Sequence, residues 1–448
     1  MKLWRVAVVG AGAAGLCVAR HILSRPNSFA LPVVFELTDS VGGTWCYDER
    51  VGTYENGRPV HSSMYRDLRY LNGCVANRAN KSTGCRPQAP GDPRSLRLTT
   101  CHPHLNSFLP HQEVQKYLER YCQSHNIRPH VRFSTVVEKV EPVVMTTEDD
   151  KTTQWEVTSS DSSGCWKTET FDSVFICSGH YSDPHIPQIP GIENFKGQVL
   201  HSHSYRYAEP FSGQSVVVLG ARASGLDISI ELTKVGAKVI LSHRHPPLTV
   251  PLPSGIQQSS PVEAVDDNGR IRFEDGSVSE AEVLIFCTGY NFRYPFLDAA
   301  QLGLEIQDHF VSPLYRFLLP PEFPSLFFIG MCKIICPFPN FNCQVQFALA
   351  VLDGTVTLPS RAEMEGEVWR ELQAKRERGV QQRHLLVMDQ DQWEYCQTLA
   401  QAAGFPPLAP VVRSLYEEVW QQRKIHPEHY RRLNYRLISD TEWELKED

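Results

Sequence analysis

Two stretches of the chain share one pattern, in which a short apolar run leads into a glycine-rich turn and then into a helical period. The first run spans Arg5 to Val9 and its turn spans Gly10 to Gly15. The second run spans Ser215 to Leu219 and its turn spans Gly220 to Gly225. Neither run alternates apolar and polar residues, which predicts strands that are buried on both faces. Each stretch is therefore predicted to be a strand–turn–helix unit of an α/β protein.

The first turn reads Gly10-Ala11-Gly12-Ala13-Ala14-Gly15. Gly10 permits a tight turn, Gly12 lets a pyrophosphate approach the backbone, and Gly15 lets the helix pack closely on the strand. The first N–H groups of the helix then face the phosphates. A second strand, Val33 to Phe35, ends in Glu36, 21 residues after Gly15, where a carboxylate accepts hydrogen bonds from ribose hydroxyls. These features together predict a bound dinucleotide.

The second turn reads Gly220-Ala221-Arg222-Ala223-Ser224-Gly225. Arg222 replaces the middle glycine, so a side chain lies where backbone usually meets pyrophosphate, although its charge suits a phosphate. The next strand, Lys238 to Leu241, ends in Ser242-His243-Arg244-His245, without an acidic residue. A hydroxyl and a guanidinium at this position suit a 2′-phosphate, so the turn is predicted to prefer NADP(H) over NAD(H). Two dinucleotides held in one chain most simply exchange a hydride.

A second pair of glycines follows the predicted ribose carboxylate. Gly42 and Gly43 allow backbone to approach a ligand, and Thr44 and Trp45 come directly after them. Taken alone, this stretch is typical of a turn with a tryptophan in the core. Its position just after Glu36 favours a role beside the cofactor, where Trp45 would pack next to a flat ring.

The remaining periodicity predicts further elements around these two units. A helical face runs from Val114 through Tyr121 to His125. Strands are predicted at Val131 to Val140, Trp155 to Thr158, Val174 to Cys177, Ile271 to Phe273, Val283 to Phe286 and Leu326 to Ile329. The C-terminal third predicts polar helices at Met364 to Arg378, Gln392 to Ala402 and Val411 to Gln422, which we interpret as a cap on the first domain without chemistry of its own.

Composition narrows the class of protein. The 448 residues suffice for two or three domains, and 42% hydrophobic with 21% charged residues is typical of a globular protein. A net charge of −7 and the lack of a long basic run argue against nucleic-acid binding. The 13 cysteines include no C-x-x-C pair, which favours reduced thiols in a cytoplasmic enzyme. No stretch reaches the ~18 apolar residues of a membrane span.

One segment, Tyr70 to about His102, interrupts the periodic pattern. It carries Cys74, Cys85 and Cys101 with several arginines and prolines, but no helical or strand period. Long loops of this kind are uncommon inside compact domains, and we interpret the segment as a surface insert. The cysteine spacing matches no standard metal site, so no metal is predicted.

The stretch between the two glycine turns carries the most specific motif. Phe195, Gly197, His201 and Tyr205 match the pattern F-x-G-x-x-x-H-x-x-x-Y, the fingerprint of the flavin-containing monooxygenases. Gly42 to Trp45 is similar to that family's G-G-x-W, and Phe286 to Tyr290 is similar to its F-x-T-G-Y. The chain therefore resembles the flavin-containing monooxygenases from about residue 3 to about residue 435, with the main break at Tyr70 to His102.

The resemblance implies two cofactors and a mechanism. It implies NADPH on the second turn, with candidate binding residues Gly220, Ser224, Gly225, Ser242 and Arg244. It implies FAD on the first turn, with candidate binding residues Gly10, Ala11, Gly12, Ala13, Ala14, Gly15, Glu36, Gly43, Thr44, Trp45 and Val137. In the implied reaction NADPH reduces the flavin, oxygen adds at flavin carbon 4a, and a soft sulfur or nitrogen attacks the hydroperoxide. Little side-chain acid–base chemistry is needed, because the cofactor carries the reactive group.

Two positions distinguish this chain within the resemblance. The Baeyer–Villiger relatives carry Trp, usually followed by Pro, where this chain has Tyr205 and Arg206, which favours heteroatom oxygenation. The family places Leu-x-Thr-Asn after its Ser-Met-Tyr run, and its Asn supports the oxygenated flavin. Here Asn72 falls one place late, and it is the candidate catalytic residue. If Asn72 does not serve, the chain is expected to act as an NADPH oxidase that releases hydrogen peroxide.

We predict an α/β protein with two Rossmann-like domains, the smaller inserted into the larger. Residues 1–208 form the first part of the FAD-binding domain, 209–325 the NADPH-binding domain, and 326–448 the return to the first domain and the helical cap. The predicted activity is NADPH- and O2-dependent oxygenation of small nucleophilic compounds. A non-catalytic FAD- and NADP-binding protein is the alternative from another class, and a disulfide reductase would need a redox cysteine pair. A homodimer and a peripheral membrane contact are left open, as is the substrate.

Overall fold

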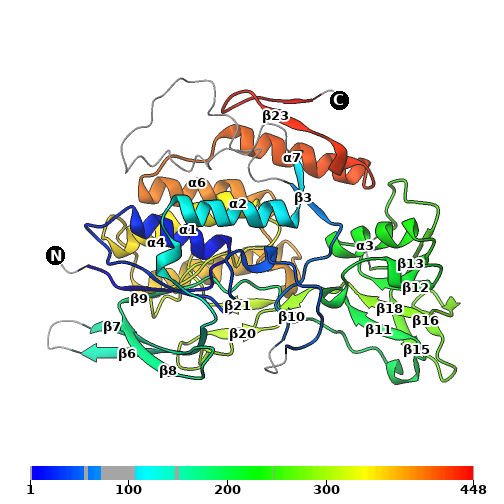
Figure 1. Ribbon diagram of the computed structural model, residues 1–448, viewed down its shortest axis with the longest axis horizontal. Helices are drawn as coiled ribbons and strands as arrows, with labels where there is room; N and C mark the ends of the chain where they lie inside the picture. Colours follow the sequence, from blue (N-terminus) through cyan, green and yellow to red (C-terminus); the bar gives the residue numbers. More distant parts are fainter. Residues whose placement is uncertain (1–2, 55–58, 72–105, 147–150, 245, 447–448) are drawn as a thin grey trace.

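The structure is a computed structural model, and it describes residues 3–54, 59–71, 106–146, 151–244 and 246–446. Asn72 and the rest of the aperiodic stretch up to His102 lie outside these ranges. Two parallel sheets organise the chain, and the second lies to one side of the first (Figure 1). Among the described residues, no helix is long and apolar enough to cross a membrane.

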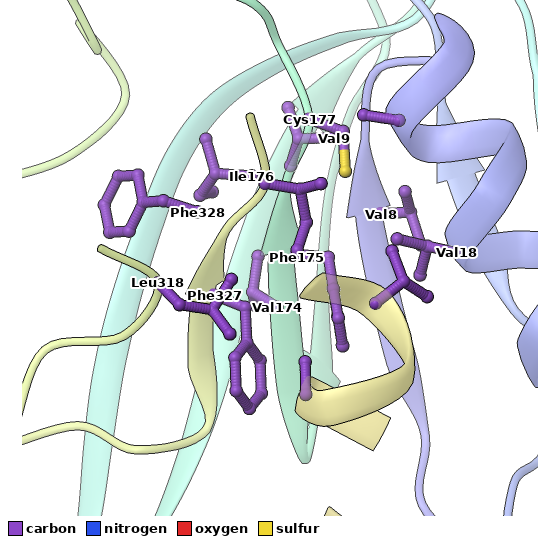
Figure 2. Close-up of a cluster of buried hydrophobic side chains, with 14 of the residues drawn as sticks. Val8, Val9, Val18, Val174, Phe175, Ile176, Cys177, Leu318, Phe327 and Phe328 are labelled. Atoms are coloured by element: carbon purple, nitrogen blue, oxygen red, sulfur yellow. The ribbon is translucent and has the colours of Figure 1, made fainter. Parts of the chain in front are cut away.

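The first sheet is parallel throughout, in the order β22-β9-β1-β2-β5. Its strands come from distant parts of the chain: β1 (Val6–Val9), β2 (Val33–Phe35), β5 (Val131–Arg132), β9 (Ser173–Ile176) and β22 (Leu326–Phe328). Val8 pairs with Phe175 across the centre of the sheet, and Phe175 stacks on Phe327 with ring centroids 4.8 Å apart. Figure 2 shows these apolar side chains on both faces of the central strands. Burial on both faces explains why the strands read as continuous apolar runs.

Helices cover one side of the first sheet. They are α1 (Ala13–Leu23), α2 (His111–Ser124), α4 (Pro337–Leu352) and α6 (Asp391–Ala403). A buried hydrogen bond of 2.8 Å joins His21 of α1 to Asn342 of α4. The sequence pattern did not predict α4, because this helix is buried on almost every side and has no polar face to give a period.

The second sheet is also parallel, in the order β11-β18-β12-β13-β14. Its elements are β11 (Gln198–His201), β12 (Ser215–Leu219), α3 (Ala223–Lys234), β13 (Lys238–Ser242), β14 (Ile256–Ser259) and β18 (Val283–Phe286). A small antiparallel sheet adjoins it, made of β15 (Val262–Val265), β16 (Ile271–Phe273) and β17 (Val278–Ser279). β11 pairs within this second sheet, although it precedes residue 208, the limit predicted for the first part of the FAD-binding domain. The domain limits proposed from the sequence stay a prediction.

A short ribbon of β10 (Asp183–Pro184) and β19 (Tyr290–Asn291) joins segments from before and after the second sheet. The return of the chain then forms the hairpin of β20 (Glu305–Gln307) and β21 (Phe310–Ser312) before β22. The predicted arrangement, an α/β protein with one parallel-sheet unit inserted into another, is confirmed.

The strand expected over Val131 to Val140 is divided between two sheets. β5 ends at Arg132, and β6 (Val136–Thr146) begins an antiparallel sheet with β7 (Lys151–Ser160) and β8 (Trp166–Phe171). Between them Ser134 adopts a φ of +49°, which breaks the extended backbone. The amides of Ser134 and Thr135 donate to the carbonyls of Thr38 and Glu36, so this bend is held against the end of β2.

The C-terminal part contains α5 (Arg361–Glu377), α6, α7 (Pro410–Ile425) and the hairpin of β23 (Tyr435–Leu437) and β24 (Trp443–Leu445). Ser360 and Glu363 form a capping box that begins α5. In Figure 1, α7 and β23 lie above the helices of the first sheet and close to β3 (Arg69–Leu71). β3 pairs with β4 (Phe108–Pro110). The predicted helices are present; the hairpin was not predicted.

Candidate functional site

The first glycine turn closes against the neighbouring strand β9. Gly10 has a φ of +104°, and a Cβ there would lie 2.6 Å from the carbonyl oxygen of Cys177. A Cβ on Gly15 would lie 1.9 Å from the carbonyl oxygen of Gly10. The Gly10 amide donates to the carbonyl of Phe35 at 2.8 Å, which ties the turn to the end of β2. Only glycine satisfies these two positions, so α1 starts directly at the carboxyl edge of the sheet.

The start of α1 offers unsatisfied backbone donors. The helix begins after Gly12 with no side-chain cap and no acidic residue in its first turn. A Cβ on Gly12 would meet only backbone atoms of Gly42 and Gly43, at ordinary distances of 3.6–4.0 Å. The protein's own packing therefore does not require glycine at position 12. A glycine there agrees instead with leaving room for a phosphate at the start of the helix. The turn fits the pyrophosphate of a dinucleotide.

Glu36 lies at the end of β2, buried beside this turn. One carboxylate oxygen accepts the Ala11 amide at 2.7 Å, and the other accepts the amide and the hydroxyl of Thr38 at 2.9 and 2.8 Å. The carboxylate therefore lies within hydrogen-bonding distance of the glycine turn itself. This is the position from which an acidic side chain reaches the ribose of a dinucleotide bound to the turn.

The second pair of glycines closes over the first turn. The Gly42 amide donates to the carbonyl of Ala11 at 3.1 Å, and Gly43 begins a short 3-10 helix, η1 (Gly43–Trp45). A Cβ on Gly43 would lie 3.0 Å from the Cα of Gly12. Thr44 contacts the hydroxyl of Ser63 at 3.3 Å, and Trp45 packs edge-on against Phe338 with ring centroids 6.4 Å apart.

Two of the predicted residues in this region differ in their surroundings. Trp45 packs against the edge of the main core and is partly exposed. Val137 is a buried member of that core on β6, just beyond the bend that contacts Glu36. The structure thus brings the glycine turn into contact with Glu36 and with Gly43, which η1 continues through Thr44 and Trp45. Val137 lies beyond the bend.

The second glycine turn repeats the geometry of the first. Gly220 has a φ of +104°, and a Cβ there would lie 2.6 Å from the carbonyl of Cys287. A Cβ on Gly225 would lie 1.6 Å from the carbonyl of Gly220. The Gly220 amide donates to the carbonyl of Ser242 at 2.8 Å, the counterpart of the bond from Gly10 to Phe35. The helix α3 begins without a side-chain cap or an acidic residue in its first turn, so this turn also fits a dinucleotide.

Two polar residues lie at and just after the end of β13, and they differ in exposure to solvent. Ser242 is buried, and its hydroxyl donates to the carbonyl of Ser260 at 2.8 Å. Arg244 is exposed and lines a cavity of about 620 Å³ together with Arg222. The Arg222 side chain lies 3.3 Å from the ring of His384, so it extends toward the C-terminal part of the chain. Ser224, at the second position of α3, is half-buried.

The four fingerprint residues occupy structural positions around β11. Phe195 is buried in the core of the second sheet, and a Cβ on Gly197 would lie 2.2 Å from the carbonyl of Glu282. His201 ends β11, where its Nδ1 accepts the amide of His203 at 3.0 Å. Tyr205 is 1% exposed and stacks on Phe211. The four fingerprint residues therefore shape the segment by which the chain enters the second parallel sheet.

Arg206, directly after the fingerprint, is a residue whose role the sequence did not reveal. Its guanidinium is buried and donates five hydrogen bonds of 2.6–3.1 Å, all to backbone carbonyl oxygens. The acceptors belong to Asp48, Arg50, Ser62, His203 and Tyr205. Arg206 thus holds the loop after Trp45 against the segment that leads into the second sheet.

Two buried polar contacts tie α3 to its surroundings. Tyr205 donates to Glu231 at 3.0 Å, and burial raises the pKa of Glu231 to about 7. Asp227 accepts a bidentate ion pair from Arg431 at 2.9 and 2.8 Å, while Arg431 also donates to the carbonyl of Arg69. The helix that follows the second glycine turn is therefore fixed both to the fingerprint and to the C-terminal part of the chain.

Two parallel sheets, each with a glycine turn that fits a dinucleotide, are the arrangement of an oxidoreductase that uses two dinucleotide cofactors. The family model "Flavin-binding monooxygenase-like" matches residues 3–250 and 252–445. The chain is 36% identical to flavin-containing monooxygenase FMO GS-OX5 of Arabidopsis thaliana, over 95% of this chain and 88% of the relative. It is 30% identical to senecionine N-oxygenase of Tyria jacobaeae, over 99% of this chain and 92% of the relative.

Among solved structures, the S-allyl-L-cysteine S-oxygenase of Allium sativum superposes with a TM-score of 0.81 at 32% identity, covering 96% of this chain and 95% of the other. The chain belongs to the flavin-binding monooxygenase family. It is an NADPH-dependent flavin-containing monooxygenase, and its cofactors are FAD and NADPH. The resemblance seen in the sequence, the enzyme class and both cofactors are therefore confirmed.

Proposed function

We propose that this monooxygenase uses NADPH and O2 to oxygenate soft nucleophilic sulfur or nitrogen in small molecules. The observation that carries the proposal is the repeated glycine turn, with the same φ of +104° at Gly10 and Gly220 and the same uncapped helix behind each. Relatives named as an S-oxygenase and as an N-oxygenase match nearly the whole chain, which supports heteroatom oxygenation. Tyr205 and Arg206, in place of Trp and Pro, support it further.

FAD is proposed to bind the first turn. The N–H groups at Gly12, Ala13 and Ala14 would receive the pyrophosphate, and Glu36 would receive the ribose hydroxyls. Gly43, Thr44 and Trp45 would line the same site, because Gly43 lies directly against Gly12. Bound there, the flavin would supply the electron transfer and the activation of O2.

NADPH is proposed to bind the second turn. Ser224 and Gly225 lie in the first turn of α3, where N–H groups are available to a pyrophosphate. Arg244 follows the end of β13, the position that faces the adenosine ribose in this fold, and a guanidinium there suits a 2′-phosphate. The hydroxyl of Ser242 already donates to the carbonyl of Ser260. Ser242 would therefore contribute chiefly through its backbone carbonyl, which accepts the Gly220 amide and positions the turn.

Asn72 is proposed to support oxygen chemistry at the flavin. It lies outside the described residues, directly after β3, whose last residue Leu71 pairs with Phe108. Its displacement by one position is the specific observation in favour of a second function, an NADPH oxidase that releases hydrogen peroxide. A cytoplasmic location and a homodimer are further proposals from the sequence.

The test measures product, oxygen and peroxide together. The FAD-loaded protein is given NADPH in air with methyl phenyl sulfide or a tertiary amine, with ¹⁸O2 as the label source. The proposal expects labelled sulfoxide or N-oxide in step with NADPH consumption. Peroxide in step with NADPH, without labelled product, would support the oxidase instead, and no NADPH consumption would leave a non-catalytic dinucleotide-binding protein.

The contribution of Asn72 is tested by substitution. Asn72→Ala is expected to divert most of the NADPH oxidation to hydrogen peroxide and to lower labelled product roughly tenfold or more, on the scale of one lost stabilising hydrogen bond. Asn77→Ala, the same change five residues later, is the matched control and is expected to stay coupled. Equal coupling in the two variants would remove Asn72 from the site.

A further inference from the structure

We propose that the C-terminal segment 378–391 completes the NADPH site, with Arg383 and His384 holding a phosphate group of the coenzyme together with Arg222 and Arg244. The inference rests on the proposed placement of NADPH at the second glycine turn and adds to it. The segment belongs to a part of the chain from which no chemistry was predicted. Its residues become candidates because of a cavity and of the charges that line it.

The cavity lies between the second glycine turn and the end of α5. It has a volume of about 620 Å³, within the range of ligand sites, and Arg222 and Arg244 line one part of it. Residues of the segment line the rest, together with Lys375 of α5. Five cationic side chains face it against two carboxylates, those of Asp389 and Asp391. The cavity is therefore suited to an anion.

The segment is held rigidly in place. The ammonium of Lys375, buried at the end of α5, donates to the carbonyls of Leu385 and Val387 at 2.7 and 3.3 Å. The backbone of Lys333 pairs with the same stretch, through bonds of 2.8 and 2.9 Å that involve Leu386 and Met388. Arg383 and His384 thus extend from a fixed backbone, which lowers the conformational entropy that a ligand would have to remove.

Most of the positive charge in the cavity lacks a carboxylate partner. Among the described residues, neither Arg222, Arg244 nor Arg383 forms an ion pair, whereas Arg378 lies 3.8 Å from Asp391. Arg222 lies 3.3 Å from His384. Burial, together with the charges of Arg222 and Arg383, lowers the pKa of His384 to about 4. Near neutral pH its ring is uncharged, and Nε2 can accept a hydrogen bond from Arg222.

The repulsion between these positive charges is unfavourable for the protein alone, and a bound anion would offset it. Burial lowers the pKa of the Arg222 guanidinium, and the positive charge of Arg383 lowers it further. A phosphate dianion would neutralise the cluster, and guanidinium groups bind phosphate through paired hydrogen bonds. The start of α3 adds free N–H donors beside Arg222.

The ligand chemistry follows from the place of the cavity. Arg222 occupies the middle position of the glycine turn, and Arg244 follows β13, so both belong to the site proposed for the dinucleotide. A coenzyme with an additional phosphate monoester supplies the charge that the cluster lacks, and NAD(H) does not. Arg383 is therefore expected to determine the preference for the phosphorylated coenzyme, although it lies more than a hundred residues from the turn.

The test compares Arg383, in the segment after α5, with Arg376, in the last turn of α5. Arg383→Gln removes a charge from the cavity, and Arg376→Gln removes the same charge from an exposed position outside it. Binding of NADP⁺ and of NAD⁺ to the full-length, FAD-loaded protein is measured by calorimetry, without turnover. Arg383→Gln is expected to weaken NADP⁺ binding about 10- to 100-fold and to change NAD⁺ binding less than about threefold. Arg376→Gln is expected to match the unaltered protein.

Adenosine 2′-phosphate serves as a second probe, with adenosine as its control. It is expected to compete with NADP⁺ in the unaltered protein and to lose most of that ability in Arg383→Gln. If the unaltered protein prefers NADP⁺ and Arg383→Gln binds it equally well, the C-terminal contribution is wrong while the proposed function stands. If the unaltered protein shows no preference for NADP⁺ over NAD⁺, both the proposed coenzyme site and this inference are overturned.

Discussion

Replacing Arg206 tests whether its guanidinium holds the two dinucleotide-binding parts together. All five guanidinium N–H groups donate to backbone carbonyls, and Arg206 itself is 5% exposed. Each such bond contributes about 1 kcal/mol net. A lysine carries three donors, so Arg206→Lys leaves at least two buried carbonyls without a partner and should cost about 2 kcal/mol. Arg206→Ala loses all five bonds and should cost up to about 5 kcal/mol.

The assay is thermal unfolding of the FAD-loaded protein. For a domain of ordinary size, a loss of about 2 kcal/mol lowers Tm by about 4–8 °C. Arg66→Lys is the matched control, because Arg66 makes exposed ion pairs with Asp67 and Glu209 and should change Tm little. If Arg206→Lys leaves Tm within about 1 °C of the unaltered protein, the five bonds do not stabilise the fold as argued.

Two further predictions concern pH and FAD. The pKa of Glu231 is raised from 4.5 to about 7 by burial, so its stability contribution is present below about pH 4.5 and is lost as the pH rises through about 7. Glu231→Gln should therefore raise the free energy of unfolding at pH 8, by up to about 3 kcal/mol, and with it Tm. At pH 4.5 the substitution should change Tm little. A difference in Tm that does not depend on pH would refute this. Gly12→Ala should keep the FAD-free fold by circular dichroism, because the nearest contact of its Cβ is an ordinary 3.6 Å. The variant should nevertheless lose FAD, because the Cβ would fill the room proposed for the pyrophosphate. Gly15→Ala should lose the fold itself, because its Cβ would lie 1.9 Å from a carbonyl oxygen. Tight FAD binding by Gly12→Ala would contradict the proposed site.

The local parts of the site could be predicted from the sequence because their causes are local. A φ of +104° at Gly10 and Gly220, and the near-contact at Gly15, follow from strand, turn and helix over about ten residues. Continuous apolar runs are the direct result of burial on both faces of a parallel sheet. The family motif between the two turns then identified the order of the sheets and both cofactors.

What the sequence did not show depends on contacts between distant residues. Two acceptors of Arg206, the carbonyls of Asp48 and Ser62, precede it by 158 and 144 residues, and no pattern along the chain records them. Likewise, His384 reaches Arg222 across 162 residues. Helix α4 carries buried Asn340 and Gln344 among apolar neighbours, so it lacks the polar face by which a helix is recognised.

The central claim is that this protein couples NADPH and O2 to oxygenation, and one rapid-mixing experiment tests it most directly. The FAD-loaded protein is reduced with NADPH in the absence of air and then mixed with oxygenated buffer while the flavin spectrum is recorded. We expect a third spectrum, distinct from those of oxidised and reduced flavin, that persists until methyl phenyl sulfide is added and then decays as sulfoxide forms. Direct return to oxidised flavin with release of hydrogen peroxide, or no reduction by NADPH, would contradict it.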